Sequence, residues 1–164
     1  MRKSTWHDSY SRQHSIKPQR GFNLPHCGCF GHKKIYLCGI TPTPVDRFGR
    51  PNKELVKVAL GAEKYCEWEH VPKTYILLDK LKQDGYTIYA LEQAKNAYSL
   101  KKIHLSKTMQ TKSALVVGNE VKGLSKTIQK RADYIIEIPM LGIKESLNVA
   151  VSFGIATYSL INNH

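Results

Sequence analysis

Small and polar residues interrupt an apolar pattern near the C-terminal end of the chain, in the segment EIPMLGIKESLNVAVSFGIA from Glu137 to Ala156. Pro139 prevents further strand pairing and Gly142 permits a sharp bend, so a loop is expected before the final helix. Ser146 is expected at or near the N-terminus of that helix, where its hydroxyl could cap the helix or orient a polar substrate. Asn148 is expected inside the helix, where an amide must find partners or cost about 1 to 3 kcal/mol. The segment is therefore a candidate site for a polar substrate.

A second candidate site is the segment VVGNEVKGLS, in which Gly118 ends an apolar run and Gly123 precedes the next expected helix. Glycines there let the backbone approach a ligand or turn with positive φ, and ligands of open α/β sheets bind at the carboxyl ends of strands. An ordinary turn between a strand and a helix explains the same pattern. The spacing matches neither a Walker loop nor the dinucleotide fingerprint, so a phosphate cradle is not indicated.

Alternating strand and helix patterns must position these two segments. Short apolar runs predict buried strands at 34–39, 86–92, 114–117 and 134–140. Apolar spacings of three and four predict helices at 52–65, 74–85, 125–132 and 146–161, the last with Leu147, Val151, Gly154 and Tyr158 along one stripe. Strands that alternate with helices predict an α/β domain with a parallel sheet over 34–164. Residues 1–33 show neither period and are expected to form a basic, irregular N-terminal arm.

Composition indicates a compact α/β domain with a basic surface. The chain has 164 residues, 41% of them hydrophobic, and a formal net charge of +12. This charge indicates either a polyanionic partner, with nucleic acid foremost, or simply a soluble basic surface. The four cysteines are too few and too irregular for a disulfide framework, which favours a reducing, cytoplasmic setting. No apolar run is long enough to span a bilayer or to form a signal peptide, so membrane and secreted classes are not expected.

Together the two candidate segments resemble the SpoU-type members of the SPOUT superfamily, which are RNA methyltransferases with a trefoil knot. LVVGNEVKGLS is similar to the second motif of that family and ADYIIEIPMLGIKESLNVAVSFGIA to its third, and the resemblance extends from about Phe30 to the C-terminus. It implies a SPOUT α/β trefoil knot, with a parallel sheet flanked by helices on both faces, in a homodimer. The implied reaction is methyl transfer from S-adenosylmethionine to a ribose 2′-hydroxyl of tRNA or rRNA.

The resemblance also implies a role for individual residues. Those implied to contact S-adenosylmethionine, largely through backbone groups, are Gly118, Ile138 and Leu147, with Met140 nearby. Those implied to hold the site and the ribose hydroxyl are Glu120, Ser146 and Asn148. These seven residues form the expected catalytic and cofactor-binding site.

The first motif of the family is shortened in this chain. FNLPHCGCFGHKKIYLCG keeps Asn23 and the pair Phe30 and Gly31, but no arginine lies between them. In the family, an arginine of this motif reaches across the dimer interface and holds the developing oxyanion, a large source of rate enhancement. Arg20 or another basic residue could replace it. The alternative function is a catalytically weak or inactive module that binds RNA or cofactor, and a basic RNA-binding protein without a cofactor is a third.

The N-terminal segment leaves two further alternatives. His26, Cys27, Cys29 and His32 could suggest zinc, but their spacing does not match the paired ligands of structural zinc sites, so no metal is expected. Residues 1–34 also contain seven Lys or Arg and the aromatic residues Trp6, Tyr10 and Phe22. Such a mixture can contact phosphates and stack on unpaired bases, and a solvated tail has the same composition.

Overall fold

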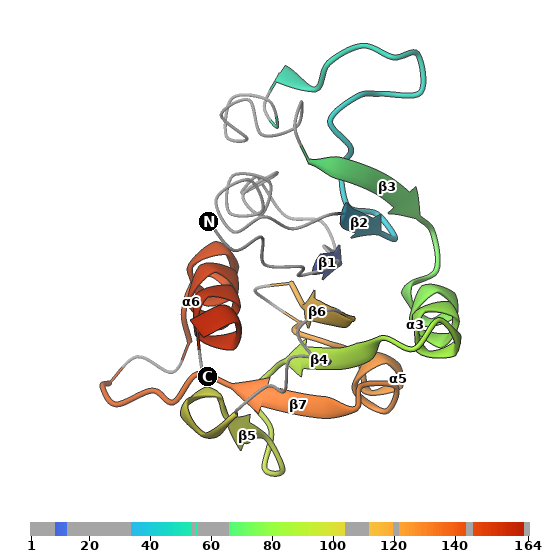
Figure 1. Cartoon of the computed structure of the whole chain (residues 1–164). Coiled ribbons are helices and arrows are strands. Elements are labelled where there is room, and N and C mark those ends of the chain that lie inside the picture. Colours follow the sequence, from blue (N-terminus) through green and yellow to red (C-terminus); the bar gives the residue numbers. More distant parts are fainter. Residues whose placement is uncertain are drawn as a thin grey trace.

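Seven strands of the described residues form a single, fully parallel sheet (Figure 1). The computed structural model describes residues 9–12, 34–53, 55, 66–103, 112–119, 122–143 and 146–162. The strands are β1 (Ser9–Arg12), β2 (Lys34–Cys38), β3 (Glu67–Val71), β4 (Thr87–Leu91), β5 (Tyr98–Ser99), β6 (Ser113–Val117) and β7 (Tyr134–Glu137). Their order across the sheet is β3-β2-β1-β6-β4-β7-β5. The predicted α/β architecture with a parallel sheet is confirmed.

Helices cover both faces of this sheet (Figure 1). The described helices are α3 (Thr74–Gln83), the short 3-10 helix η2 (Leu100–Lys102), α5 (Lys126–Gln129) and α6 (Val149–Asn162). Helices α3 and α5 contribute to one apolar cluster, and α6 and η2 contribute to the other. None of the helices that the structure describes is long and apolar enough to span a membrane. The threading of the chain that a trefoil knot requires stays a prediction.

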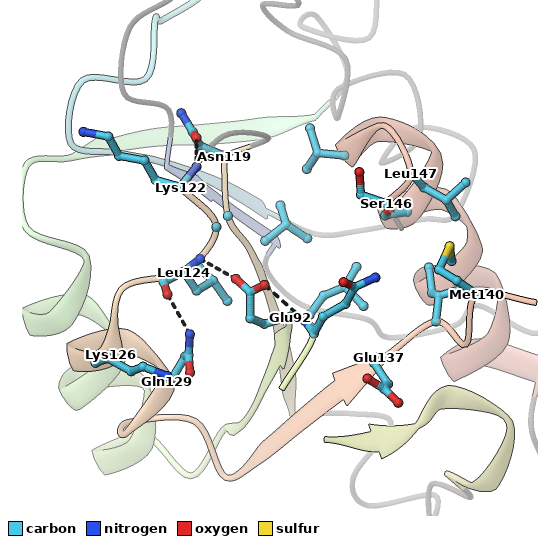
Figure 2. Close-up of a pocket in the computed structure, with 18 residues that line it drawn as sticks. Glu92, Asn119, Lys122, Leu124, Lys126, Gln129, Glu137, Met140, Ser146 and Leu147 are labelled. Carbon is cyan, nitrogen blue, oxygen red and sulfur yellow. Dashed lines mark hydrogen bonds between the residues drawn. The ribbon is translucent and has the colours of Figure 1, made fainter. Parts of the chain in front are cut away.

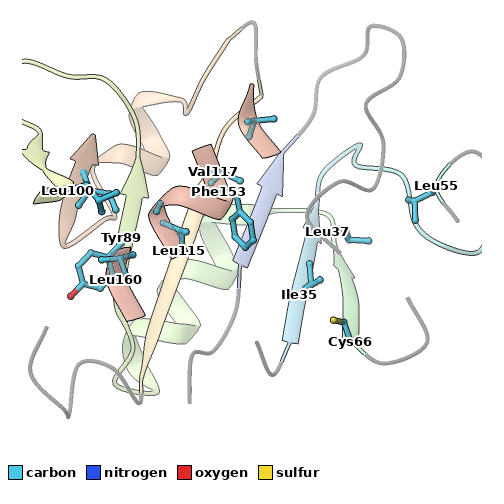
Figure 3. Close-up of a cluster of buried hydrophobic side chains, with 13 residues drawn as sticks. Ile35, Leu37, Leu55, Cys66, Tyr89, Leu100, Leu115, Val117, Phe153 and Leu160 are labelled. Carbon is cyan, nitrogen blue, oxygen red and sulfur yellow. The ribbon is translucent and has the colours of Figure 1, made fainter. Parts of the chain in front are cut away.

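Strand β6 shows why a buried strand has no polar face. All five of its residues are buried. Leu115 and Val117 belong to the cluster under α6, whereas Ala114 and Val116 belong to the cluster under α3 and α5. Successive side chains of a strand point to opposite faces of the sheet, so a strand covered on both sides must be apolar throughout. Figure 3 shows Leu115 and Val117 beside Phe153 of α6, which is fully buried.

The stripe singled out on α6 and the side of the helix that packs on the sheet are different faces. The buried residues of the helix are Val149, Phe153, Ala156, Thr157 and Leu160. Val151 and Tyr158, from the predicted stripe, are instead 48% and 61% exposed. The helix carries apolar residues on most of its circumference, so the 3.6-residue period alone could not select the face that is buried.

Strand β1 lies in the middle of the sheet and was not predicted. It pairs in parallel with β2 on one side and with β6 on the other. Its sequence, SYSR, has no apolar run, and it falls in the segment that was expected to be irregular. The first-motif residues, the four possible zinc ligands and most of the helix predicted at 52–65 lie outside the described residues.

Candidate functional site

A cavity of about 580 Å³ opens where β4, β6 and β7 end and α6 begins (Figure 2). Because all strands are parallel, the loops that follow these three strands emerge at one edge of the sheet. This edge is where open α/β sheets bind their ligands. The volume is within the range of pockets for small molecules and cofactors. The fold therefore forms a cavity of ligand size at the edge of the sheet to which both candidate segments lead.

Five of the seven predicted site residues line this single cavity: Gly118, Ile138, Met140, Ser146 and Leu147. They come from three segments that are distant in sequence, namely the end of β6, the end of β7 and the loop before α6. Glu120 lies outside the described residues. Asn148 is described and does not line the cavity. The two motifs thus meet in space, as the resemblance implies.

Asn148 caps helix α6. Its side-chain Oδ1 accepts a hydrogen bond from the backbone N–H of Ala150 at 2.9 Å, and its carbonyl oxygen accepts one from the N–H of Ser152 at 2.9 Å. The prediction that Asn148 lies inside the helix is therefore wrong, because the helix begins at Val149. Ser146 lies two residues before the cap and faces the cavity instead.

The loop after β6 closes on itself in a tight turn. The N–H of Gly123 donates to the carbonyl of Asn119 at 2.9 Å, and Oδ1 of Asn119 accepts the N–H of Lys122 at 2.8 Å. Gly123 has φ +59°, a conformation that favours glycine. A Cβ on Gly118 would lie 2.4 Å from the carbonyl carbon of Gly123. Close backbone approach therefore requires glycine at Gly118, and the positive φ favours it at Gly123. This turn forms one wall of the cavity.

Glu92 is a cavity residue that the sequence pattern did not identify. It directly follows β4, and its carboxylate accepts the backbone N–H of Leu124 through Oε2 and that of Gln93 through Oε1. A Cβ on Gly123 would lie 2.3 Å from Oε2 of Glu92, so the carboxylate fills the space that glycine leaves. Glu92 thereby joins the end of β4 to the turn after β6. An acidic residue at the carboxyl end of a strand is the only sequence signal that could have indicated it.

The lining of the cavity is both polar and apolar. Figure 2 shows Lys122, Lys126 and Gln129 on one side, and Met140 and Leu147 on the other side together with Ser146 and Glu137. The side-chain nitrogen of Gln129 donates to the carbonyl of Leu124 at 2.7 Å, which adds a second support to the turn. This distribution suits a ligand that has both an apolar part and charged or hydrogen-bonding groups. The described residues include no group of three His, Cys, Asp or Glu side chains placed to hold a metal ion.

Comparison with known proteins identifies the class of protein that this fold and this site define. The SpoU rRNA Methylase family model matches residues 25–158, so the chain belongs to that family. It is 32% identical over 104 residues to the tRNA (guanosine(18)-2′-O)-methyltransferase of Borreliella burgdorferi, which covers 63% of this chain and 46% of that relative. The enzyme of the same name from Aquifex aeolicus is 35% identical over 101 residues, with coverage of 62% and 46%. The chain spans about half the length of these curated relatives.

Solved structures show the same fold. The TrmH/SpoU tRNA modifying enzyme of A. aeolicus superimposes with a TM-score of 0.73 at 26% identity, over 96% of this chain and 74% of that chain. An AdoMet-bound rRNA methyltransferase from Sinorhizobium meliloti gives a TM-score of 0.77 at 19% identity, over 96% and 56%. The resemblance inferred from the second and third motifs is confirmed.

The close approach in the turn predicts that the same substitution has different effects on stability at two glycines. Gly118→Ala should lower the free energy of unfolding by about 1 to 3 kcal/mol, because the new methyl group meets backbone that cannot move aside cheaply. Gly142→Ala is the control, since a Cβ there meets nothing within 4 Å. It should leave stability unchanged or raise it by up to about 1 kcal/mol. Urea unfolding followed by circular dichroism measures both, and equal effects would contradict this account of the turn.

Proposed function

We propose that this chain transfers a methyl group from S-adenosylmethionine to a ribose 2′-hydroxyl of tRNA or rRNA. The observation that carries the proposal is the convergence of Gly118, Ile138, Met140, Ser146 and Leu147 on one cavity, in a chain that belongs to the SpoU family. The relatives named as tRNA 2′-O-methyltransferases support the substrate class. The catalytically weak module remains the alternative, because the shortened first motif lies outside the described residues.

The residues of the cavity fit S-adenosylmethionine by their chemistry. The apolar side chains of Met140 and Leu147 suit the adenine ring and the methylene groups of the donor. Backbone groups at the ends of β6 and β7, near Gly118 and Ile138, suit the edge of the adenine, because N–H and C=O groups can match its donors and acceptors. The polar lining residues, Glu92 among them, suit the charged groups of the methionine part.

The chain must mainly provide alignment for this reaction. Bound S-adenosylmethionine supplies a methyl group on a sulfonium that is already a good leaving group. Holding the ribose oxygen in line with that methyl can supply up to about 7 to 11 kcal/mol in well-aligned systems. We assign this task to the hydroxyl of Ser146 and to Glu120, with the cap at Asn148 fixing the loop that carries Ser146. The ribose 2′-hydroxyl must also lose its proton. Arg20 or another basic residue of a partner subunit is the candidate that holds the developing oxyanion.

We also propose that the chain forms a homodimer through the exposed side of α6. Val151, Ile155 and Tyr158 repeat at spacings of four and three, so they lie on one face of the helix. All three are substantially exposed. A second copy of the chain that packs on this face would bury an apolar stripe next to the cavity and would complete the site with first-motif residues, as the family resemblance implies.

The dimer proposal predicts that a charge on this face separates the subunits. Ile155→Glu should convert a dimer into a monomer, because burying an unpaired carboxylate is strongly unfavourable. Ile155 is 41% exposed, and Ile76 on α3 is 52% exposed, so Ile76→Glu is the matched control and should stay dimeric. Sedimentation equilibrium of the wild type and both variants measures the outcome. A monomeric wild type, or a dimeric Ile155→Glu variant, would contradict the proposal.

The cofactor proposal predicts different effects for two leucines of the same loop. Leu147 lines the cavity and is 38% exposed, whereas Leu141 is 88% exposed and lies outside it. Leu147→Ala should weaken binding of S-adenosylmethionine by roughly 5- to 30-fold, which corresponds to losing about 1 to 2 kcal/mol of apolar contact. Leu141→Ala should bind as the wild type does. Isothermal titration calorimetry measures both affinities, and the absence of any binding by the wild type would contradict the proposal.

The proposed reaction predicts methyl incorporation into RNA at alkali-resistant positions, because a 2′-O-methyl group blocks cleavage of the adjacent phosphodiester. The full chain is incubated with bulk tRNA or rRNA and methyl-labelled donor. Asn148→Ala should abolish transfer and lower stability by about 1 kcal/mol through loss of the cap. Asn148→Asp keeps the capping oxygen and should keep stability. If Asn148→Asp is stable but does not transfer the methyl group, the amide nitrogen of Asn148 acts on the substrate. A wild type that binds the donor but transfers no methyl group supports the alternative of an inactive module.

A further inference from the structure

The loop that follows β2 is a compact hairpin built around one carboxylate, that of Asp46. Residues 44–52 form this hairpin, which we call the Phe48 hairpin. Oδ1 of Asp46 accepts the backbone N–H of Phe48 at 2.8 Å and that of Arg50 at 2.9 Å, and Oδ2 accepts Nε–H of Arg50 at 3.0 Å. The N–H of Arg50, together with these other donors, lowers the pKa of the Asp46 carboxyl.

The backbone of the hairpin is paired across its base as well. The N–H of Asp46 donates to the carbonyl of Arg50 at 2.9 Å, and the N–H of Asn52 donates to the carbonyl of Pro44 at 2.8 Å. Gly49, with φ +77°, allows the chain to reverse at the tip. The tip is therefore held in one conformation by its own hydrogen bonds, although it is exposed to solvent.

This rigid tip presents an aromatic ring between two guanidinium groups. Phe48 is 64% exposed. The guanidinium carbons of Arg47 and Arg50 each lie 4.8 Å from the centroid of its ring. Arg47 makes no ion pair within the described part of the chain, and the single ion pair of Arg50 there is the one to Asp46. The hairpin thus displays a flat apolar surface between two guanidinium groups, of which that of Arg50 is paired through Nε with Asp46.

The Phe48 hairpin emerges from the same edge of the sheet as the cavity. It follows the carboxyl end of β2, and the turn with Gly118 follows the carboxyl end of β6. In the sheet only β1 separates these two parallel strands, which places them about 10 Å apart at the usual spacing of strands. Figure 1 shows the hairpin, in cyan, projecting beyond β2 and β3. A polymer bound at the cavity can therefore extend along this edge to the hairpin.

We propose that Phe48 stacks on an unpaired base of the RNA substrate while Arg47 and Arg50 contact the neighbouring phosphates. The proposal rests on the proposed function, in that RNA is the substrate. Single-stranded RNA is recognised by stacking of splayed bases on aromatic rings and guanidinium planes. Arginine forks bind phosphate oxygens in bidentate fashion. A guanidinium over an exposed ring is held weakly, so a base can displace it from the ring toward a phosphate.

The test compares single-stranded and duplex RNA by fluorescence anisotropy of a labelled oligoadenylate and of a labelled mixed-sequence duplex. Phe48→Ala and Phe48→Leu should weaken binding of the single strand by about 5- to 150-fold, the range that loss of one base–aromatic stack gives. Phe48→Tyr should bind as the wild type does, because it keeps the ring. Duplex affinity should not change in any variant, because paired bases cannot reach the ring.

A second exposed aromatic residue provides the control for a general surface effect. Tyr75 is 37% exposed, and the guanidinium carbon of Arg131 lies 5.4 Å from its ring centroid. Tyr75→Ala should leave single-strand affinity unchanged. Arg47→Gln should make the slope of log affinity against log salt shallower by about 0.7, which is the contribution of one phosphate contact on a single strand.

Failure of this inference is distinguishable from failure of the proposed function. All Phe48 variants should bind S-adenosylmethionine with the affinity of the wild type, because the hairpin contributes no residue to the cavity. If the wild type binds the donor and the single strand, and Phe48→Ala binds the single strand equally well, stacking by Phe48 is overturned while the proposed function stands. Equal losses for single strand and duplex would also overturn it, since they would indicate a purely electrostatic contact.

Discussion

The site depends on the close approach of two stretches of backbone, at Gly118 and at Gly123. The chain can leave β6 and return beside itself because Gly118 carries no side chain, and Gly123 leaves room for the carboxylate of Glu92. The carboxylate of Glu92 occupies the adjoining space and accepts the N–H of Leu124, so the turn is joined to β4 as well as closed on itself. A buried N–H needs a partner, and a carboxylate is a strong acceptor for it. The hydrogen bond between Glu92 and Leu124 therefore holds the wall of the cavity in place and connects the end of β4 to the turn after β6.

The order of the strands brings the remaining walls to the same place. Strands β6, β4 and β7 are consecutive neighbours in the sheet, so the residues that follow them, Gly118, Glu92 and Ile138, meet although they are distant in sequence. The two-sided burial of β6 makes this arrangement rigid, because its side chains are packed into both apolar clusters. The position of the cavity is thus a consequence of the parallel pairing of the strands. The loops contribute only the few residues that shape its surface.

Much of this arrangement could be predicted from local sequence, and the exceptions have physical causes. Strands β2, β4, β6 and β7 are apolar runs, which is how strands buried on both faces appear. Strand β3 lies at an edge of the sheet and has the polar sequence EWEHV, and β1 has the sequence SYSR. Neither sequence shows the period of a strand. Both segments form strands because they pair with neighbouring strands. The role of Glu92 depends on a hydrogen bond to a residue 32 positions away, which no local pattern contains.

The boundary of α6 determines what each polar residue before it can do. A helix that began at Ser146 would use the serine hydroxyl as a cap and would leave the amide of Asn148 within its first turn. With the helix beginning at Val149, the oxygen of Asn148 satisfies the N–H of Ala150, and Ser146 stays outside the helix at the cavity. A shift of the helix start by a few residues therefore decides which of the two residues caps the helix and which one faces the cavity. In this site the cap is what places the serine, because it fixes the point at which the loop ends.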